Sequence, residues 1–261
     1  MSAMDFTLEK YRALTEALKG GGYESLTFAE YMEGRRPERF VMLRHDVDLL
    51  PYNSLATARL EAEEGLRASY YFRAVPESWD EMVIGEIAAL GHEVGYHYES
   101  LTTCAGDMEA ALKDFEANLS KLRELVPVRT ICMHGSPRSP YDSRLLWTGG
   151  RSYRQLGITG EPYFDVDFDD VFYLTDTGRR WDGFKVSVRD KVAAQDRWTR
   201  QGLVFHSTDD VIRALSAGIL PPRVMITTHP QRWTDRPVPW ARELLLQNAK
   251  NIVKRVLVWR A

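Results

Sequence analysis

Short apolar runs alternate along the chain with segments in which apolar residues recur every three or four positions. The short runs are typical of buried strands, and the recurring pattern is typical of amphipathic helices. From residue 40 onward the alternation predicts an α/β fold whose right-handed crossovers build a parallel sheet, either open or closed as a barrel. The predicted strands are Phe40–Asp48, Ala68–Arg73, His92–Tyr98, Thr130–His134, Val171–Leu174, Phe184–Val188 and Val224–Thr228.

Helices are predicted between these strands and before the first of them. The clearest is Asp107–Val126, where apolar residues recur at the spacing of one helix face. Two helices precede the first strand, and three consecutive glycines end the first of these. The other predicted helices are Phe6–Lys19, Thr27–Met32, Ser54–Leu66, Trp79–Leu90, Asp209–Leu215 and Trp240 to about Leu257.

Composition narrows the class of protein. The 261 residues suffice for one large α/β domain or two small ones. With 34 basic and 37 acidic residues and no basic stripe, nucleic-acid binding driven by charge is not expected. The first residues do not form a secretory signal and no apolar run is long enough to span a membrane, so we expect a cytoplasmic protein without a membrane contact. The sequence does not determine the oligomeric state.

Titratable side chains stand where four predicted strands end. Asp46 and Asp48 end the first, His97 and Glu99 the third, His134 the fourth and His229 the last. Because the carboxyl ends of parallel strands meet on one rim, we expect these side chains to form one site.

The residue types at this rim suit a metal-assisted reaction. Asp46 and Asp48 lie two residues apart and therefore on the same side of a strand, where one can bind a cation while the other accepts a proton from water. His97 is a suitable ligand for zinc. Less specific interpretations are a solvated strand end or helix cap for the two acids, and a packed core position for the histidine.

The sequence resembles the polysaccharide deacetylase family, the NodB-homology fold of carbohydrate esterase family 4. The resemblance rests on Asp46-x-Asp48, on the string Gly91-His92-Glu93-Val94-Gly95-Tyr96-His97, and on Thr228-His229-Pro230, and it covers residues 40 to 233. It implies a distorted, incomplete β/α barrel. We therefore expect a single domain over residues 1–261, with an N-terminal helical segment in 1–39 and the barrel in 40–261.

The resemblance also implies roles for individual residues. Asp46 falls on the catalytic base, Asp48 and His97 on metal ligands, and His229 on the acid that protonates the departing amine. The family's second metal histidine falls on Leu101, which cannot bind a metal. We expect His134 to supply the third ligand instead, with Glu99 as the alternative.

The expected activity is therefore hydrolysis of an N-acyl amide, such as an N-acetyl group, on a sugar or sugar-derived substrate, with one divalent ion, Zn²⁺ by preference. Two alternatives remain open. The Leu101 position allows a metal-independent amidohydrolase on the same fold, and a degenerate site would leave a carbohydrate-binding or scaffolding protein without catalytic activity.

Other polar and aromatic residues are candidates for substrate binding or for structural roles. Arg44 precedes Asp46 and could orient it. The loop from Asp176 to Gly183 has the arginines and the tryptophan that could hold a sugar ring and an anionic group, unless it is a solvated hairpin turn. His45, His92 and His206 are expected to be structural or peripheral. The candidate substrate-binding residues are Arg44, Glu99, Arg179, Trp181 and Trp233.

Overall fold

The computed structural model describes residues 4–135, 139–185 and 191–259. Its centre is one curled parallel sheet with the strand order β5-β4-β3-β2-β7-β6. A short strand, β1, pairs with the first half of β2, and β3 pairs with the second half. The strands are β1 (Glu24–Leu26), β2 (Phe40–Val47), β3 (Ser69–Phe72), β4 (Glu93–Tyr98), β5 (Ile131–Met133), β6 (Phe172–Thr175) and β7 (Arg223–Thr228).

Each ladder between these strands is parallel, and β5 and β6 form the two ends of the order. The sheet is therefore a barrel that stays open between β5 and β6. This confirms the predicted α/β class and the incomplete β/α barrel, including a helical segment before the first barrel strand.

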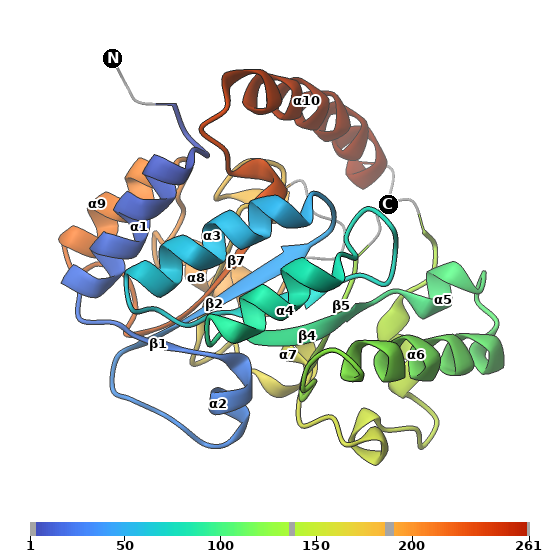
Figure 1. The fold of residues 1–261 in the computed structure, drawn as a ribbon. Coiled ribbons are helices and arrows are strands. Elements are labelled where there is room, and N and C mark those ends of the chain that lie inside the picture. Colours follow the sequence, from blue (N-terminus) through green and yellow to red (C-terminus); the bar gives the residue numbers. More distant parts are fainter. Residues whose placement is uncertain (1–3, 136–138, 186–190, 260–261) are drawn as a thin grey trace.

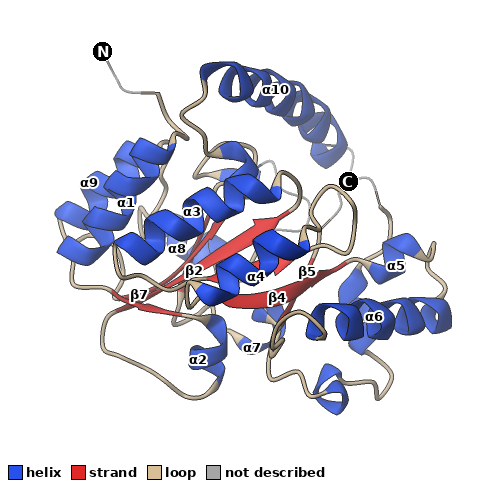
Figure 2. Ribbon diagram, in the orientation of Figure 1, coloured by secondary structure: helices blue, strands red, loops and turns tan. Residues whose placement is uncertain are grey.

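Helices connect the strands, as Figures 1 and 2 show. In Figure 2, α3 and α4 cross the front of the sheet. The long helices are α1 (Leu8–Gly20), α3 (Pro51–Glu63), α4 (Glu81–Ala89), α6 (Met108–Arg123), α9 (Thr208–Ser216) and α10 (Pro237–Trp259). The short ones are α2 (Phe28–Met32), α5 (Ser100–Thr103), α7 (Pro162–Asp165) and α8 (Gln195–Arg200).

Side-chain caps set where several of these helices begin. The hydroxyl of Thr7 accepts from the backbone N–H of Lys10 at the start of α1, and Asp107 caps α6 in the same way. Ser207 and Asp210 form a reciprocal capping box at α9. Each cap satisfies backbone donors that the first turn leaves unpaired, and removal of such a cap costs about 1 kcal/mol.

Strand β2 is buried on both faces, and its alternation divides the interior into two cores. Val41, Leu43 and Val47 pack with the outer helices. Phe40 and Met42 point into the curl of the sheet. Arg44 and Asp46 continue this inner face because side chains alternate along a strand. The inner face therefore changes from apolar to charged toward the carboxyl end of β2.

One predicted strand is wrong. Residues Gly183–Lys185 form a 3₁₀ turn, and the rest of the predicted segment Phe184–Val188 lies outside the described residues. The sequence prediction also missed β1, α5, α7 and α8, which are too short for a periodic pattern to reveal.

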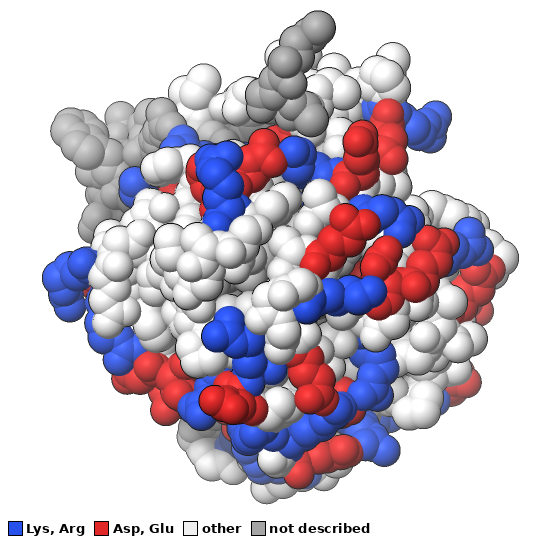
Figure 3. All heavy atoms as spheres, turned by 90° about the vertical axis from the view of Figure 1, so that its left-hand side faces the viewer, with Lys and Arg blue, Asp and Glu red and all other residues white. Residues whose placement is uncertain are grey.

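The outer surface has charges of both signs. In Figure 3, lysine and arginine side chains alternate with aspartate and glutamate side chains over the face that includes α1. Arg12 and Lys19 of α1, for example, pair with Glu64. Within the described ranges, no helix combines the length and apolar character that a membrane span requires.

Candidate metal centre

Three potential ligand side chains converge at the carboxyl ends of the strands. Asp48 follows β2, His97 lies near the end of β4, and His134 follows β5. One ligand atom from each lies within 4.8 Å of the ligand atoms of the other two. The structure thus brings together the three residues predicted as metal ligands.

Both imidazoles present the correct nitrogen to this centre. The Nδ1 of His97 donates to the carbonyl oxygen of Cys132 at 2.9 Å, and the Nδ1 of His134 donates to Oε2 of Glu99 at 2.7 Å. Their Nε2 atoms lie 3.7 Å and 3.5 Å, respectively, from Oδ1 of Asp48. Histidine ligands of metals are held in this way, with one ring nitrogen bonded to the protein and the other free to bind.

The hydrogen bonds of Asp48 show whether these three residues suit a metal ion. Its Oδ2 accepts a hydrogen bond from Nε2 of Gln231 at 3.2 Å, whereas the buried Oδ1 has no hydrogen-bond partner among the described residues. An unpaired buried carboxylate oxygen is costly unless a cation neutralises it. This oxygen faces two imidazole lone pairs, so the residues fit a divalent ion of the Zn²⁺ type.

The protonation states suit metal binding. Burial lowers the pKa of His97 to about 4, so its imidazole is neutral at neutral pH. Burial acts to raise the pKa of Asp48, but the neighbouring His134, His229 and His97 outweigh it, and the pKa is lowered. A neutral imidazole and an ionised carboxylate are the forms that bind metals.

Glu99, the alternative third ligand, is already occupied. Its Oε1 accepts from Nε and Nη2 of Arg73 at 2.9 Å and 2.6 Å, and its Oε2 accepts from His134. Burial would raise the pKa of Glu99, but the hydrogen bond from His134 and the charge of Arg73 lower it to about 2. Glu99 therefore orients a ligand, while Leu101 is buried in the apolar core.

Asp46 lies beside this centre and is held by Arg44. Nε and Nη2 of Arg44 donate to Oδ1 and Oδ2 of Asp46 at 3.0 Å and 2.9 Å. Oδ2 of Asp46 lies 3.8 Å from Nε2 of His97. Burial acts to raise the pKa of Asp46, but the Arg44 guanidinium outweighs it, so the carboxyl group stays ionised at neutral pH.

A second group of possible ligands consists of Asp46, His97 and Cys132. It shares His97 with the first group. Because Arg44 already neutralises Asp46 through two hydrogen bonds, the group of Asp48, His97 and His134 suits a cation better than this second group does.

His229 lies on the other side of Asp48. Its Nδ1 donates to Oδ1 of Asp176 at 2.6 Å, and its Nε2 lies 4.0 Å from Oδ2 of Asp48. Burial and Arg232 lower the pKa of His229, but the carboxylates of Asp176 and Asp48 outweigh them and raise it. The arrangement holds Nε2 toward the centre and favours a protonated imidazole.

Three residues predicted to contact a substrate have side chains that are buried in the fold. Arg179 is buried and pairs with Glu243 of α10. The indole N–H of Trp181 donates to Thr208. The indole N–H of Trp233 donates to Oδ2 of Asp176 at 2.9 Å, so this tryptophan positions the carboxylate that holds His229.

The two other predicted substrate contacts are engaged with site residues. Arg44 is 1% exposed and binds Asp46, and Glu99 is bound by Arg73 and His134. Nη1 of Arg44 has no hydrogen-bond partner among the described residues, so a substrate contact of Arg44 stays a prediction, as does one of Glu99.

The remaining histidines lie away from this centre, as expected. His45 is fully buried and bonded to Glu61, and His92 bonds the carbonyl oxygen of Ala58. His206 contacts Asp182.

Sequence reasoning missed three residues that support the site: Arg73, Asp176 and Gln231. Arg73 and Asp176 directly follow β3 and β6, so the same strand-end argument applies to them. Asp176 was grouped with the loop that follows it, and Arg73 was included in its strand. Gln231 has no such signal, because an uncharged amide after His229-Pro230 does not stand out.

Of the comparisons with known proteins, the comparison with solved structures found similar chains. No family model matches the chain, and no curated protein matches its sequence. A pseudoenzyme from Bacillus anthracis is 11% identical, with 82% of this chain and 61% of that chain covered and a TM-score of 0.41. The described chain thus spans about three fifths of that protein.

Two further matches have both chains largely covered. A peptidoglycan deacetylase from Bacillus subtilis is 12% identical, with coverages of 84% and 96% and a TM-score of 0.38. An acetyl xylan esterase from Clostridium thermocellum, solved with a cobalt ion, is 16% identical, with coverages of 80% and 83% and a TM-score of 0.35.

The pseudoenzyme and the esterase are described as members of carbohydrate esterase family 4. At these identities and TM-scores we derive the function of this chain from its own site.

Proposed function

We propose that this protein is a metal-dependent hydrolase that removes an acyl group from the nitrogen of a sugar or sugar-derived substrate. The observation that carries the proposal is Oδ1 of Asp48, which has no hydrogen-bond partner within residues 4–135, 139–185 and 191–259 and faces the Nε2 atoms of His97 and His134. A divalent cation held by these three residues would supply Lewis-acid activation of water and of the acyl carbonyl.

Asp46 is positioned to act as the base. Its carboxylate is ionised and fixed by two hydrogen bonds from Arg44, which leaves little rotational freedom. A carboxylate of low pKa is a weak base, but it suffices for a water whose own pKa is lowered toward about 7. Asp46 therefore accepts the proton of the attacking water.

His229 is positioned to act as the acid. Its raised pKa keeps a proton available, and the hydrogen bond to Asp176 fixes the ring so that Nε2 faces the centre. The nitrogen of an amide must be protonated before it leaves as an amine. His229 donates that proton, and Asp176 stabilises the charge on the ring until then.

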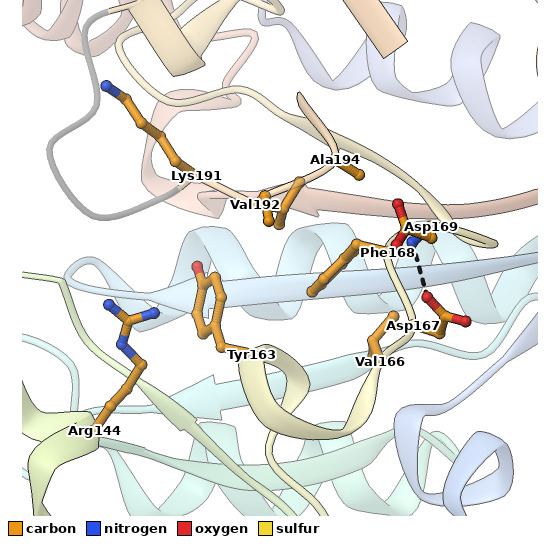
Figure 4. A pocket seen from close by; sticks show the side chains of 10 residues that line it. Arg144, Tyr163, Val166, Asp167, Phe168, Asp169, Lys191, Val192 and Ala194 are labelled. Atoms are coloured by element: carbon orange, nitrogen blue, oxygen red, sulfur yellow. Dashed lines mark hydrogen bonds between the residues drawn. The ribbon is translucent and has the colours of Figure 1, made fainter. Parts of the chain in front are cut away.

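A cavity beside Tyr163 is a candidate position for the rest of a substrate. It has a volume of about 320 Å³ and is lined in part by Tyr163, Phe168 and Arg144 (Figure 4). The hydroxyl of Tyr163 accepts from Nη2 of Arg44 at 3.2 Å, so one wall of the cavity contacts the residue that holds Asp46. Aromatic and apolar walls of this kind suit the faces of a sugar ring.

The test is a screen for release of free amine by the metal-loaded protein from N-acetylated sugars and nucleotide sugars. We also propose a cytoplasmic location, which favours nucleotide sugars and other small N-acyl compounds over cell-wall polymers. The proposal predicts amine release that a chelator abolishes and added Zn²⁺ restores. Turnover that is unchanged in metal-free protein would support the metal-independent alternative, and saccharide binding without turnover would support an inactive binding protein.

A further inference from the structure

Gln231 lies in the 3₁₀ turn Pro230–Arg232 that directly follows His229, and the residue is only 7% exposed. Its Nε2 donates to Oδ2 of Asp48 at 3.2 Å. The amide therefore presents its nitrogen to Asp48, and this contact fixes its orientation. The amide oxygen is therefore directed away from Asp48.

This amide oxygen, Oε1 of Gln231, is buried and has no hydrogen-bond partner in the described part of the chain. A buried acceptor without a donor is unfavourable, so the position selects for a group that brings an N–H or O–H. The position of His229, which faces the same carboxylate oxygen of Asp48, narrows the choice of donor group. Its Nε2 lies 4.0 Å from Oδ2 of Asp48, the atom that Gln231 contacts.

We propose that Gln231 is a specificity-determining residue, whose Oε1 accepts the N–H of the scissile amide and so makes the site prefer N-acyl over O-acyl substrates. The inference rests on the proposed function, because His229 must approach the leaving nitrogen to protonate it. His229 and Gln231 both approach Oδ2 of Asp48. A nitrogen next to Nε2 of His229 therefore lies on the same side of the Asp48 carboxylate as Gln231. An ester has an oxygen without hydrogen at this position and leaves Oε1 unpaired.

The test compares two acyl compounds that differ only in this atom, 4-nitroacetanilide and 4-nitrophenyl acetate, in the metal-loaded protein and its Gln231→Met variant. Methionine has a similar length and no acceptor of comparable strength. We expect the amide-to-ester ratio of kcat/KM to fall about tenfold or more in the variant. Partial loss of metal or of folded protein lowers both rates equally and leaves this ratio unchanged.

The control is Gln155→Met, at an exposed glutamine in the 3₁₀ turn Tyr153–Leu156, which should keep the wild-type ratio. Equal losses for both compounds in Gln231→Met would overturn the inference and leave Gln231 as a support for Asp48.

A binding measurement separates this inference from the proposed function. In the Asp46→Asn background, where we expect no turnover, calorimetry should show tighter binding of the anilide than of the ester, and Gln231→Met should remove the difference. A wild-type protein without turnover would contradict the proposed function, whereas equal binding of the two compounds would contradict the role of Gln231.

Discussion

Nε2 of His134 lies 3.5 Å from Oδ1 of Asp48, a buried oxygen with no hydrogen-bond partner in the part of the chain that the structure describes. This histidine comes from the strand next to the one that carries His97. In the proposed centre the third ligand therefore comes from across the sheet, and not from the position four residues after His97, where Leu101 is buried. Two neighbouring strand ends can thus replace one helical turn as the source of paired histidine ligands.

The first prediction concerns His134. The variant His134→Ala removes one of three ligands, so we expect its affinity for Zn²⁺ to fall by at least about 100-fold, more than the loss of an outer hydrogen bond would cause. A competition titration with a coloured chelator measures the affinity. His206→Ala, at a mostly exposed histidine, is the matched control and should bind as the wild type does. Wild-type affinity in His134→Ala would remove His134 from the centre.

The second prediction concerns Glu99. In Glu99→Gln the side chain keeps a similar shape but loses the charge that polarises His134 and pairs with Arg73. Residues that support a ligand in this way contribute about 10- to 100-fold to metal affinity. The same titration should show a loss in this range with the metal stoichiometry retained. Complete loss of the metal would instead identify Glu99 as a direct ligand.

The third prediction separates the base from the ligands. Asp46→Asn is close in shape and keeps the inner face of β2, so we expect it to retain the metal. Without a carboxylate to accept the proton of water, amine release should fall by about 100- to 10,000-fold. Metal content and turnover are measured on the same preparation. A variant that keeps wild-type turnover would show that Asp46 is not the base.

The fourth prediction concerns the pH dependence of the acid. His229 must be protonated to act, so activity should be lost as the pH rises through its pKa, which the Asp176 and Asp48 carboxylates raise. Asp176→Asn removes the nearer charge and should shift the alkaline limb of kcat against pH toward lower pH. The acidic limb should stay in place. An alkaline limb that does not move would argue against His229 as the group that titrates.

The fifth prediction links Asp176 to stability. Burial would raise the pKa of Asp176, but Arg232 and His229 lower it to about 2, below the ordinary value of about 3.9. A depressed pKa contributes stability at pH values above about 4, and this contribution is lost as the pH falls toward 2. Urea unfolding should therefore show a deficit for Asp176→Asn at pH 7 that narrows below pH 4. A deficit that is constant with pH would assign the effect to packing.

The sheet and the convergence of Asp48, His97 and His134 could be predicted from the sequence because both depend on short-range patterns. Apolar runs locate the strands, and parallel strands bring their carboxyl ends together, so Asp48, His97 and His134 meet. The residues that orient them could not be predicted in this way. Gln231 contacts Asp48 across 183 positions of the chain, and only the fold shows the pair.

The burial of two predicted substrate contacts has a physical cause as well. Arg179 and Trp181 stand in a polar, glycine-containing loop, which in a sequence looks the same whether it is solvated or buried. The structure buries both side chains, because Glu243 and Thr208 provide partners from distant helices. Polar composition alone therefore does not distinguish a binding loop from a buried connection.

The most direct test of the central claim is the zinc content of the purified wild-type protein and of its His97→Ala variant, measured by elemental analysis after loading and desalting. A cation held by Asp48, His97 and His134 predicts one zinc per chain in the wild type and its loss in the variant. One equivalent of zinc still bound in His97→Ala would contradict the assignment of this centre.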